Sequence, residues 1–296
     1  MLSMRLFLAL VLGTFLVVVG WQSNLFATNV TLPPQDAYTD YMWEVHHDER
    51  PTPTDILTQA PDEDDTVTAE MVTYGTLEEK EIKGYLASPM NNDRPLPAII
   101  VIHEWWGLND NIKAMTRKIA AEGYTALAVD MYAGESAETP EKAMKLVTDA
   151  RNNSDRLKDN LALAYQYLEE EENAPKIASI GWCFGGSLSL KTALLFPENL
   201  DAAVIYYGGD LETDAEVLKS LEMPILGIFG ELDDRPSPET VKEFEMTLKS
   251  LDKEVEVYIY PNADHAFANP SGERYNQVAA MDAWDKTVQF FSEHLK

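Results

Sequence analysis

Ile180-Gly181-Trp182-Cys183-Phe184-Gly185-Gly186 is the stretch of this chain that decides its fold, and Cys183 is the only cysteine in the sequence. Before it, Lys176–Trp182 has the length and composition of a short buried strand, and from Gly185 onward a leucine-rich segment has the pattern of a helix. A Gly-x-Cys-x-Gly-Gly turn between a strand and a helix is typical of a nucleophile elbow, with sulfur in place of the usual hydroxyl. Such a turn lifts the thiol out of the sheet and holds it near a helix N-terminus, where the dipole favours the attacking thiolate.

Glycine is expected at two positions of this turn for a steric reason. We expect Gly181 and Gly185 to lack side chains so that the strand and the helix can approach each other. The same residues would also suit a small buried cysteine in an ordinary strand–helix connection, so the turn alone leaves both interpretations open. The rest of the chain has to decide between them.

The chain from about residue 69 to its end alternates short apolar runs with amphipathic stretches. The predicted strands are Glu70–Tyr74, Lys83–Ser88, Ala98–His103, Ala126–Asp130, Lys176–Trp182, Ala202–Tyr206, Pro224–Phe229 and Val255–Tyr260. The predicted helices are Asn111–Glu122, one opening at Thr139-Pro140-Glu141, Asp155–Glu171, one from Gly185, Asp214–Leu221, Pro238–Leu251 and Met281–Leu295. This alternation predicts an α/β domain over residues 69–296, with a mainly parallel central sheet covered by helices on both faces.

Residues 1–27 have the features of a signal peptide or an N-terminal anchor. Arg5 precedes an uncharged apolar run, Leu6–Gly20, which is about the length of a signal-peptide core and short for a membrane span. A cleavage point near Ala27 is plausible, but Leu25 is larger than the residue usually preferred there, so an uncleaved anchor stays open. We expect the protein to be exported, periplasmic or secreted, with any membrane attachment made only through this segment.

Residues 28–68 have the composition of an acidic, proline-containing linker. Between Thr28 and Glu70 there are eleven acidic residues and one basic residue, Arg50. A short amphipathic piece, Tyr38–Val45, could dock on the domain. We interpret the adjacent His46 and His47 as surface residues, because no second spaced cluster of ligands accompanies them, and we predict no metal site and no cofactor.

The charge and the single cysteine exclude several classes of function. A formal net charge of −27 argues against nucleic-acid binding, which needs lysine and arginine to neutralise phosphate, and it disfavours anionic lipid surfaces. One cysteine cannot form an intrachain disulfide.

Candidate catalytic groups follow four of the predicted strands. In a doubly wound sheet, sites form beyond the carboxyl ends of the strands, and Glu104, Cys183, Asp233 and His265 all stand there. The order Cys183, Asp233, His265, with separations of 50 and 32 residues, is the chain order of an α/β-hydrolase triad. Asp264 adjoins the histidine, but the spacing from the strand favours Asp233.

These residues stand in motifs that resemble the dienelactone hydrolase family of α/β-hydrolases, over the whole domain from about Thr68. The matching stretches are His103-Glu104-Trp105-Trp106-Gly107-Leu108, Asp130-Met131-Tyr132, Gly181-Trp182-Cys183-Phe184-Gly185-Gly186, Gly230-Glu231-Leu232-Asp233 and His265-Ala266-Phe267. The resemblance implies an α/β-hydrolase fold and a hydrolase of carboxylic ester or lactone bonds.

The resemblance also implies a role for individual residues. Cys183 would attack the carbonyl and form a thioester acyl-enzyme, while His265, oriented by Asp233, would accept and return protons. Glu104 would lie close to the resting thiol and relay its proton, although a strand-end carboxylate paired with a surface lysine is the competing interpretation. The backbone N–H groups of Phe184 and Trp105 would hold the oxyanion.

Specificity is expected to differ from that of the family prototype. The prototype clamps the substrate carboxylate with two arginines, where this chain has Ala133-Gly134-Glu135 and Asn269. We therefore expect neutral esters or lactones rather than dienelactone. The aromatic residues expected to line an apolar substrate pocket, or else to belong to the core, are Trp106, Tyr132, Trp182 and Phe267, together with Trp105.

Two other functions remain alternatives. The chain could be a non-catalytic α/β-hydrolase-like binding module, although a module without chemistry has no need of all three triad residues. It could also be a redox-active thiol protein, although a single cysteine would need an external thiol to resolve its oxidised form. Fast alkylation of Cys183 together with ester turnover distinguishes the hydrolase from both.

Overall fold

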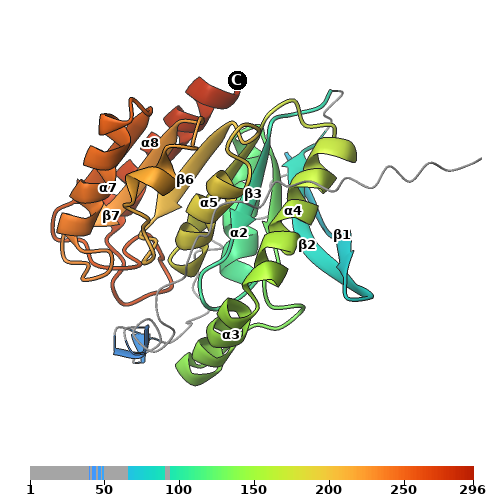
Figure 1. Ribbon diagram of the computed structural model, residues 1–296. Coiled ribbons are helices and arrows are strands. Elements are labelled where there is room, and N and C mark those ends of the chain that lie inside the picture. Colours follow the sequence, from blue (N-terminus) through green and yellow to red (C-terminus); the bar gives the residue numbers. More distant parts are fainter. Residues whose placement is uncertain (1–39, 41, 45, 48, 50–65, 91–93) are drawn as a thin grey trace, which may run out of the picture.

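The computed structural model describes residues 40, 42–44, 46–47, 49, 66–90 and 94–296 (Figure 1). The predicted segment 1–27 and most of the predicted linker 28–68 therefore lie outside the described residues. Within the described part of the chain, no helix has both the length and the apolar character needed to cross a membrane.

One eight-stranded sheet, in the order β1-β2-β4-β3-β5-β6-β7-β8, forms the centre of the domain. Its strands are β1 (Val67–Leu77), β2 (Lys80–Pro89), β3 (Ala98–Ile102), β4 (Thr125–Val129), β5 (Ile177–Trp182), β6 (Ala202–Tyr206), β7 (Ile225–Gly230) and β8 (Val255–Tyr260). The β1–β2 and β2–β4 pairs are antiparallel, and all the other neighbours are parallel. The prediction of a mainly parallel α/β sheet is confirmed.

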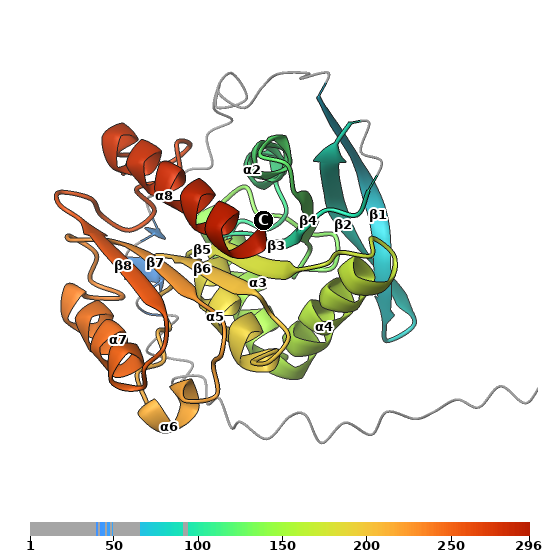
Figure 2. The same ribbon diagram turned by 90° about the horizontal axis from the view of Figure 1, so that it is seen from above.

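Helices cover both faces of this sheet, as the view from above shows (Figure 2). One face carries α2 (Asp110–Ala121) and α8 (Gln277–Leu295), and the other carries α4 (Ser154–Glu170), α5 (Phe184–Leu195) and α7 (Pro238–Ser250). Two further helices, α3 (Pro140–Asn152) and the short α6 (Ala215–Leu218), pack against α4 and α7. Since both faces are covered, every residue of β3, β4 and β5 is buried, which is why these strands are continuous apolar runs in the sequence.

The start of the domain lies two residues before the predicted boundary. Val67 and Thr68, which the sequence interpretation gave to the linker, belong to β1, where they pair with Pro89 and Ser88 of β2. The predicted first strand, Glu70–Tyr74, was therefore too short at both ends. The reason is the hairpin itself: pairing with β2 extends β1 through polar residues that carry no apolar pattern.

A short helical piece of the N-terminal segment packs on the domain (blue in Figure 1). Asp40, residues 42–44 and His46 are helical, and the side chains of Met42 and His46 are each only 1% exposed. These residues overlap the amphipathic piece expected at Tyr38–Val45, of which residues 38, 39, 41 and 45 lie outside the described residues. The interpretation of His46 as a surface residue is wrong, whereas His47 is exposed as expected.

Candidate active site

The predicted catalytic residues meet at one edge of the sheet. Glu104 follows β3, Cys183 follows β5, Asp233 follows β7 and His265 follows β8, and all four are buried. Because these strands are parallel neighbours, their carboxyl ends lie at the same edge.

The turn at Cys183 is held in an unusual backbone conformation. Cys183 caps the N-terminus of α5 with φ 54° and ψ −115°, a region that non-glycine residues rarely adopt. A Cβ atom on Gly181 would lie 2.0 Å from the Gly185 carbonyl oxygen, and one on Gly185 would lie 2.2 Å from the carbonyl oxygen of Ile102 in β3. Glycine is therefore required at both positions, as the sequence predicted.

His265 is oriented by a buried carboxylate. Its Nδ1–H donates to Asp233 Oδ2 at 2.8 Å, and the other oxygen of Asp233 accepts from the backbone N–H of Arg235 at 2.8 Å. The half-buried Asp264 accepts instead from the backbone N–H of His265 at 2.6 Å. Asp233 is thus the carboxylate that contacts the imidazole ring.

Cys183 and His265 face each other as an interacting pair. The sulfur lies within 4.8 Å of a ring nitrogen of His265, and this nitrogen is Nε2 because Nδ1 is bonded to Asp233. Burial alone would lower the pKa of His265, but the charges of Asp233 and of the Cys183 thiolate outweigh it and raise that pKa well above its usual value. The arrangement therefore favours a protonated His265 beside the sulfur of Cys183.

Glu104 is a buried carboxyl group beside this pair. Burial raises the pKa of Glu104 to about 7, although the nearby charge of His265 and the hydrogen bond from Asn269 lower it in part. The Asn269 Nδ2–H group donates to Glu104 Oε2 at 2.6 Å. The partner of Glu104 is thus an amide within the site rather than a surface lysine, and its pKa allows it to exchange a proton near neutral pH.

The backbone expected to hold an oxyanion is also at this edge. Phe184 is the first residue of α5, so its N–H has no partner within the helix. The Tyr132 hydroxyl donates to the carbonyl of Trp105 at 3.1 Å, which orients the peptide that follows Trp105. Phe184 directly follows Cys183 in the sequence, and Trp105 directly follows Glu104.

The comparisons with known proteins agree with this geometry. The model of the dienelactone hydrolase family matches residues 82–295. The chain belongs to the dienelactone hydrolase family. Like other members of this family, it is a hydrolase of ester or lactone bonds.

Individual relatives cover the same part of the chain. "Protein usf" from Aquifex pyrophilus is 35% identical over 222 residues, which are 73% of this chain and 94% of that protein. A protein from Saccharolobus solfataricus named "Putative carboxymethylenebutenolidase" is 32% identical and covers 71% of this chain and 93% of its own length. Among solved structures, the dienelactone hydrolase-like promiscuous phosphotriesterase P91, from metagenomic libraries, is 25% identical, with a TM-score of 0.70 over 78% of this chain and all of its own.

Asn269 is a residue of this dienelactone hydrolase site that the sequence interpretation missed. The sequence showed it only as the position that lacks an arginine, four residues after His265. In the structure it is buried, and its side-chain oxygen accepts from the backbone N–H of Ser271 at 2.9 Å while its amide holds Glu104. The residue that replaces a substrate clamp therefore acts on the carboxyl group of the site.

Tyr207 and His103 are two further buried residues of the site that were missed. Tyr207 follows β6, has φ 35°, and its ring centroid lies 5.2 Å from that of His265. The His103 Nδ1–H group donates to the carbonyl of Glu104 at 2.5 Å, while its Nε2 accepts from the backbone of Met131 at 3.2 Å. The strand-end rule that found the other residues could also have found Tyr207.

Three of the four aromatic residues assigned to a substrate pocket lie near the catalytic residues. The ring of Trp106 lies 4.8 Å from that of Trp105, Tyr132 stacks 5.8 Å from Phe184, and Phe267 lies 5.7 Å from Tyr207.

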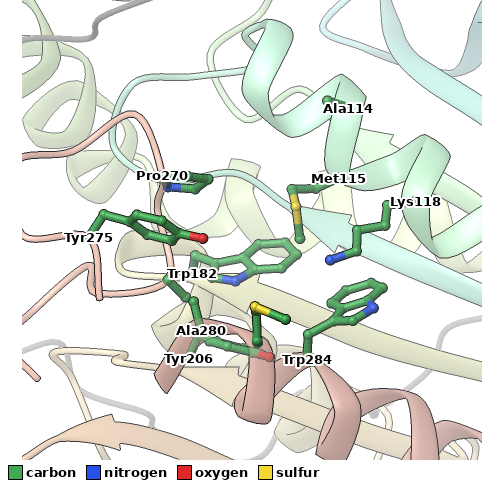
Figure 3. A pocket seen from close by; sticks show the side chains of 11 residues that line it. Ala114, Met115, Lys118, Trp182, Tyr206, Pro270, Tyr275, Ala280 and Trp284 are labelled. Carbon is green, nitrogen blue, oxygen red and sulfur yellow. The ribbon is translucent and has the colours of Figure 1, made fainter. Parts of the chain in front are cut away.

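Trp182 faces a different space from the other three. It lines a small pocket of about 70 Å³ between α2 and α8, with Met115, Lys118 and Trp284 around it (Figure 3). Neither Cys183 nor His265 lines that pocket. We therefore leave Trp182 out of the substrate pocket.

His46 enters this site from outside the catalytic domain. Its ring centroid lies 4.8 Å from Trp105 and 4.9 Å from His265. Burial holds the pKa of His46 well below its usual value, and the positive charges of His265 and Arg274 lower it further. No pattern in the sequence connects this histidine with the triad, because the contact depends on how the N-terminal segment docks.

Proposed function

We propose that the protein hydrolyses carboxylic esters or lactones through an acyl-enzyme on Cys183. The observation that carries this proposal is that the Cys183 sulfur lies within 4.8 Å of a ring nitrogen of His265, which is itself bonded to buried Asp233. A nucleophile, a base and an orienting carboxylate in this relation are the parts that acyl transfer requires.

In the first half of the reaction, the thiolate forms a bond to the substrate carbonyl carbon. The tetrahedral intermediate collapses to a thioester as the alkoxide leaves, and the protonated His265 gives the leaving oxygen its proton. In the second half, His265 takes a proton from water, the hydroxide attacks the thioester, and the acid product leaves as the thiolate is restored. Asp233 keeps the same ring nitrogen protonated throughout.

Two backbone groups and one carboxyl group complete the mechanism. The N–H groups of Phe184 and Trp105 stabilise the negative oxygen of the tetrahedral intermediate. Glu104 exchanges a proton with the resting thiol, a role that suits a carboxyl group whose pKa is about 7. Asn269 positions Glu104 for this exchange.

The charges around the site favour neutral substrates. Binding a carboxylate needs cationic donors that replace its hydration. At the two positions where the family prototype has arginine, this chain has Ala133-Gly134-Glu135 and Asn269, and the amide of Asn269 is already bonded to Glu104. The carboxylate of a charged substrate would therefore meet Glu104 rather than an arginine.

Export of the enzyme is part of this proposal. Its support is the sequence of residues 1–27, with Arg5 ahead of the apolar run Leu6–Gly20. Comparison of the N-terminus of the protein recovered from the culture medium or periplasm with that of the cytoplasmic form tests it. A protein that stays in the cytoplasm with Met1 intact would contradict export.

The catalytic proposal is tested by turnover of matched neutral and carboxylate-bearing substrates. Wild type should hydrolyse neutral activated esters and lactones, and Cys183→Ala should reduce the rate to background. For a pair of substrates that differ only in a free carboxylate, kcat/KM should be at least about tenfold higher for the neutral one, which corresponds to about 1.4 kcal/mol. Near-wild-type turnover by Cys183→Ala would contradict the mechanism, and faster hydrolysis of the carboxylate substrate would contradict the specificity.

A further inference from the structure

Three groups that can bind a metal ion converge where the N-terminal segment meets the catalytic residues. The sulfur of Cys183 and one ring nitrogen each of His46 and His265 all lie within 4.8 Å of one another. All three side chains are at most 3% exposed. Two of them belong to the proposed catalytic machinery, and His46 has no part in it.

Both histidines are oriented as metal-binding histidines commonly are. His265 donates its Nδ1–H to Asp233, as described above, and His46 Nδ1 lies 2.7 Å from Glu49 Oε1. A carboxylate on Nδ1 fixes the tautomer in which Nε2 carries the lone pair, which is the outer-sphere arrangement seen around zinc-bound histidines.

Arg274 contacts both members of the pair formed by His46 and Glu49. Its guanidinium makes an ion pair with the Glu49 carboxylate, and its Nη2 lies 3.1 Å from His46 Nδ1. Since the carboxylate is nearer to Nδ1 than Arg274 is, we assign the proton of Nδ1 to the bond with Glu49. The Nε2 atom of His46 is then free to accept or to bind a cation.

His46 Nε2 is a buried polar atom that makes no hydrogen bond within the described part of the chain. Leaving such a buried atom without a partner destabilises the folded state. Packing alone does not explain why His46 is buried, because Met42 already anchors the same helical piece in the core. It is explained if the atom has a partner that is not part of the chain.

We propose that His46, Cys183 and His265 form a binding site for a thiophilic divalent cation of the zinc type. One thiolate and two imidazoles are a ligand set that zinc favours, and a fourth position would remain for water. Tetrahedral zinc with these ligands needs donor atoms about 3.3–3.8 Å apart, given bonds of about 2.0–2.3 Å. The three donors already lie within 4.8 Å of one another, so no pair needs to close by more than about 1.5 Å to reach this geometry.

Occupation of this site would block the hydrolase. The cation shares the sulfur lone pair that attacks the substrate and takes the Nε2 of His265 that exchanges protons. Binding releases any proton carried by either atom, and removal of the cation by a chelator restores both. The N-terminal segment thereby makes the enzyme sensitive to zinc through a residue that chemistry does not require.

Metal binding is tested on the full-length, metal-free protein by calorimetric titration with Zn²⁺ and by absorption spectroscopy with Co²⁺. Wild type should bind one Zn²⁺, and Co²⁺ should produce a thiolate-to-metal charge-transfer band. His46→Gln should weaken binding of both ions at least about tenfold, since mutation of an outer-shell partner alone has an effect of that size. The matched control is His47→Gln, since His47 is exposed and its Nδ1 lies 2.9 Å from the backbone carbonyl of Trp43. Equal affinity of the two variants, or a cobalt complex without the thiolate band, would overturn the proposal.

Ester turnover provides an independent measurement. Zn²⁺ should inhibit wild type and His47→Gln reversibly, and the inhibition constant of His46→Gln, measured against its own metal-free rate, should rise at least about tenfold. Turnover without zinc binding would overturn this inference and leave the proposed function intact. Zinc binding to a protein without ester turnover would support the metal site and contradict the proposed function.

Discussion

At the scale of single residues, burial and the neighbouring charges together set the pKa values of His265 and Glu104. Asp233 and His265 are 2% and 1% exposed, so the charge of the carboxylate acts on the imidazole without screening by water. Glu104 is buried beside them, and burial raises its pKa to about 7. The amide of Asn269 and the charge of His265 offset only part of this effect.

Replacement of Asp233 by asparagine should lower kcat/KM by about 10⁴-fold without unfolding the domain. The amide removes the charge that raises the pKa of His265 and can impose the wrong tautomer, an effect of that size in serine-protease triads. Steady-state kinetics checks the rate, and the pH dependence of Cys183 alkylation checks the histidine. Asp264→Asn is the matched control, since Asp264 bonds only the backbone of His265, and it should lower the rate less than about tenfold. Similar losses in both variants would contradict the assignment of Asp233.

Replacement of Glu104 by glutamine should change how stability depends on pH. The folded-state pKa of Glu104 is raised from 4.5 to about 7, so its contribution is fully present below pH 4.5 and is lost as pH rises through about 7. Between pH 4.5 and 8, Glu104→Gln should therefore gain about 3 kcal/mol in unfolding free energy relative to wild type. Urea unfolding at both pH values measures the difference, with the exposed Glu198→Gln as a control that should follow wild type. A constant difference between Glu104→Gln and wild type would contradict the raised pKa.

At the scale of elements, the site depends on how closely β5 and α5 approach each other. The elbow holds Cys183 at positive φ only because no side chain separates Gly181 from Gly185. The helical piece around Met42 is a second element of the site, and it places the ring of His46 against that of His265.

Substitution of Gly181 by alanine should destabilise the domain by about 3 kcal/mol or more. A Cβ there would lie 2.0 Å from a backbone oxygen, and backbone cannot move aside as a side chain can. Gly272→Ala is the control, because its Cβ would meet nothing nearer than 3.4 Å, and it should change stability by less than about 1 kcal/mol. Denaturant unfolding measures both. Equal changes in the unfolding free energy of the two variants would contradict the close approach of β5 and α5 at Gly181.

Undocking of the N-terminal helical piece should expose Cys183. Met42 is 1% exposed, and loss of a buried methionine contact costs about 1.5–3 kcal/mol, so Met42→Asp should speed alkylation of Cys183 about tenfold or more. The neighbouring Trp43 is 41% exposed, so Trp43→Asp should leave the rate within about twofold of wild type. Alkylation rates measured by mass spectrometry distinguish the two. Unchanged labelling of Met42→Asp would show that this piece does not cover the thiol.

At the scale of the whole molecule, sequence predicts the order of elements better than their assembly. Each strand and helix has a local pattern, so the buried strand Lys176–Trp182 and the helix that follows it were found almost to the residue. The convergence of Cys183, Asp233 and His265 could be predicted because the three residues stand at strand ends in a fixed chain order.

Contacts between distant segments could not be predicted in this way. Asn269 bonds Glu104 across 165 residues, and His46 contacts His265 across more than 200 residues of chain. Neither contact leaves a periodicity or a spacing in the sequence. Two adjacent histidines in an acidic segment are typical of a protein surface. His46 is buried because the helical piece that contains Met42 packs on the domain.

The measurement that tests the central claim most directly is rapid-quench mass spectrometry of the enzyme mixed with an activated neutral ester. The mechanism predicts a transient mass increase of one acyl group, located on the peptide that contains Cys183 and absent from Cys183→Ala. Turnover with no acyl group on Cys183, or with the acyl group on another residue, would contradict it.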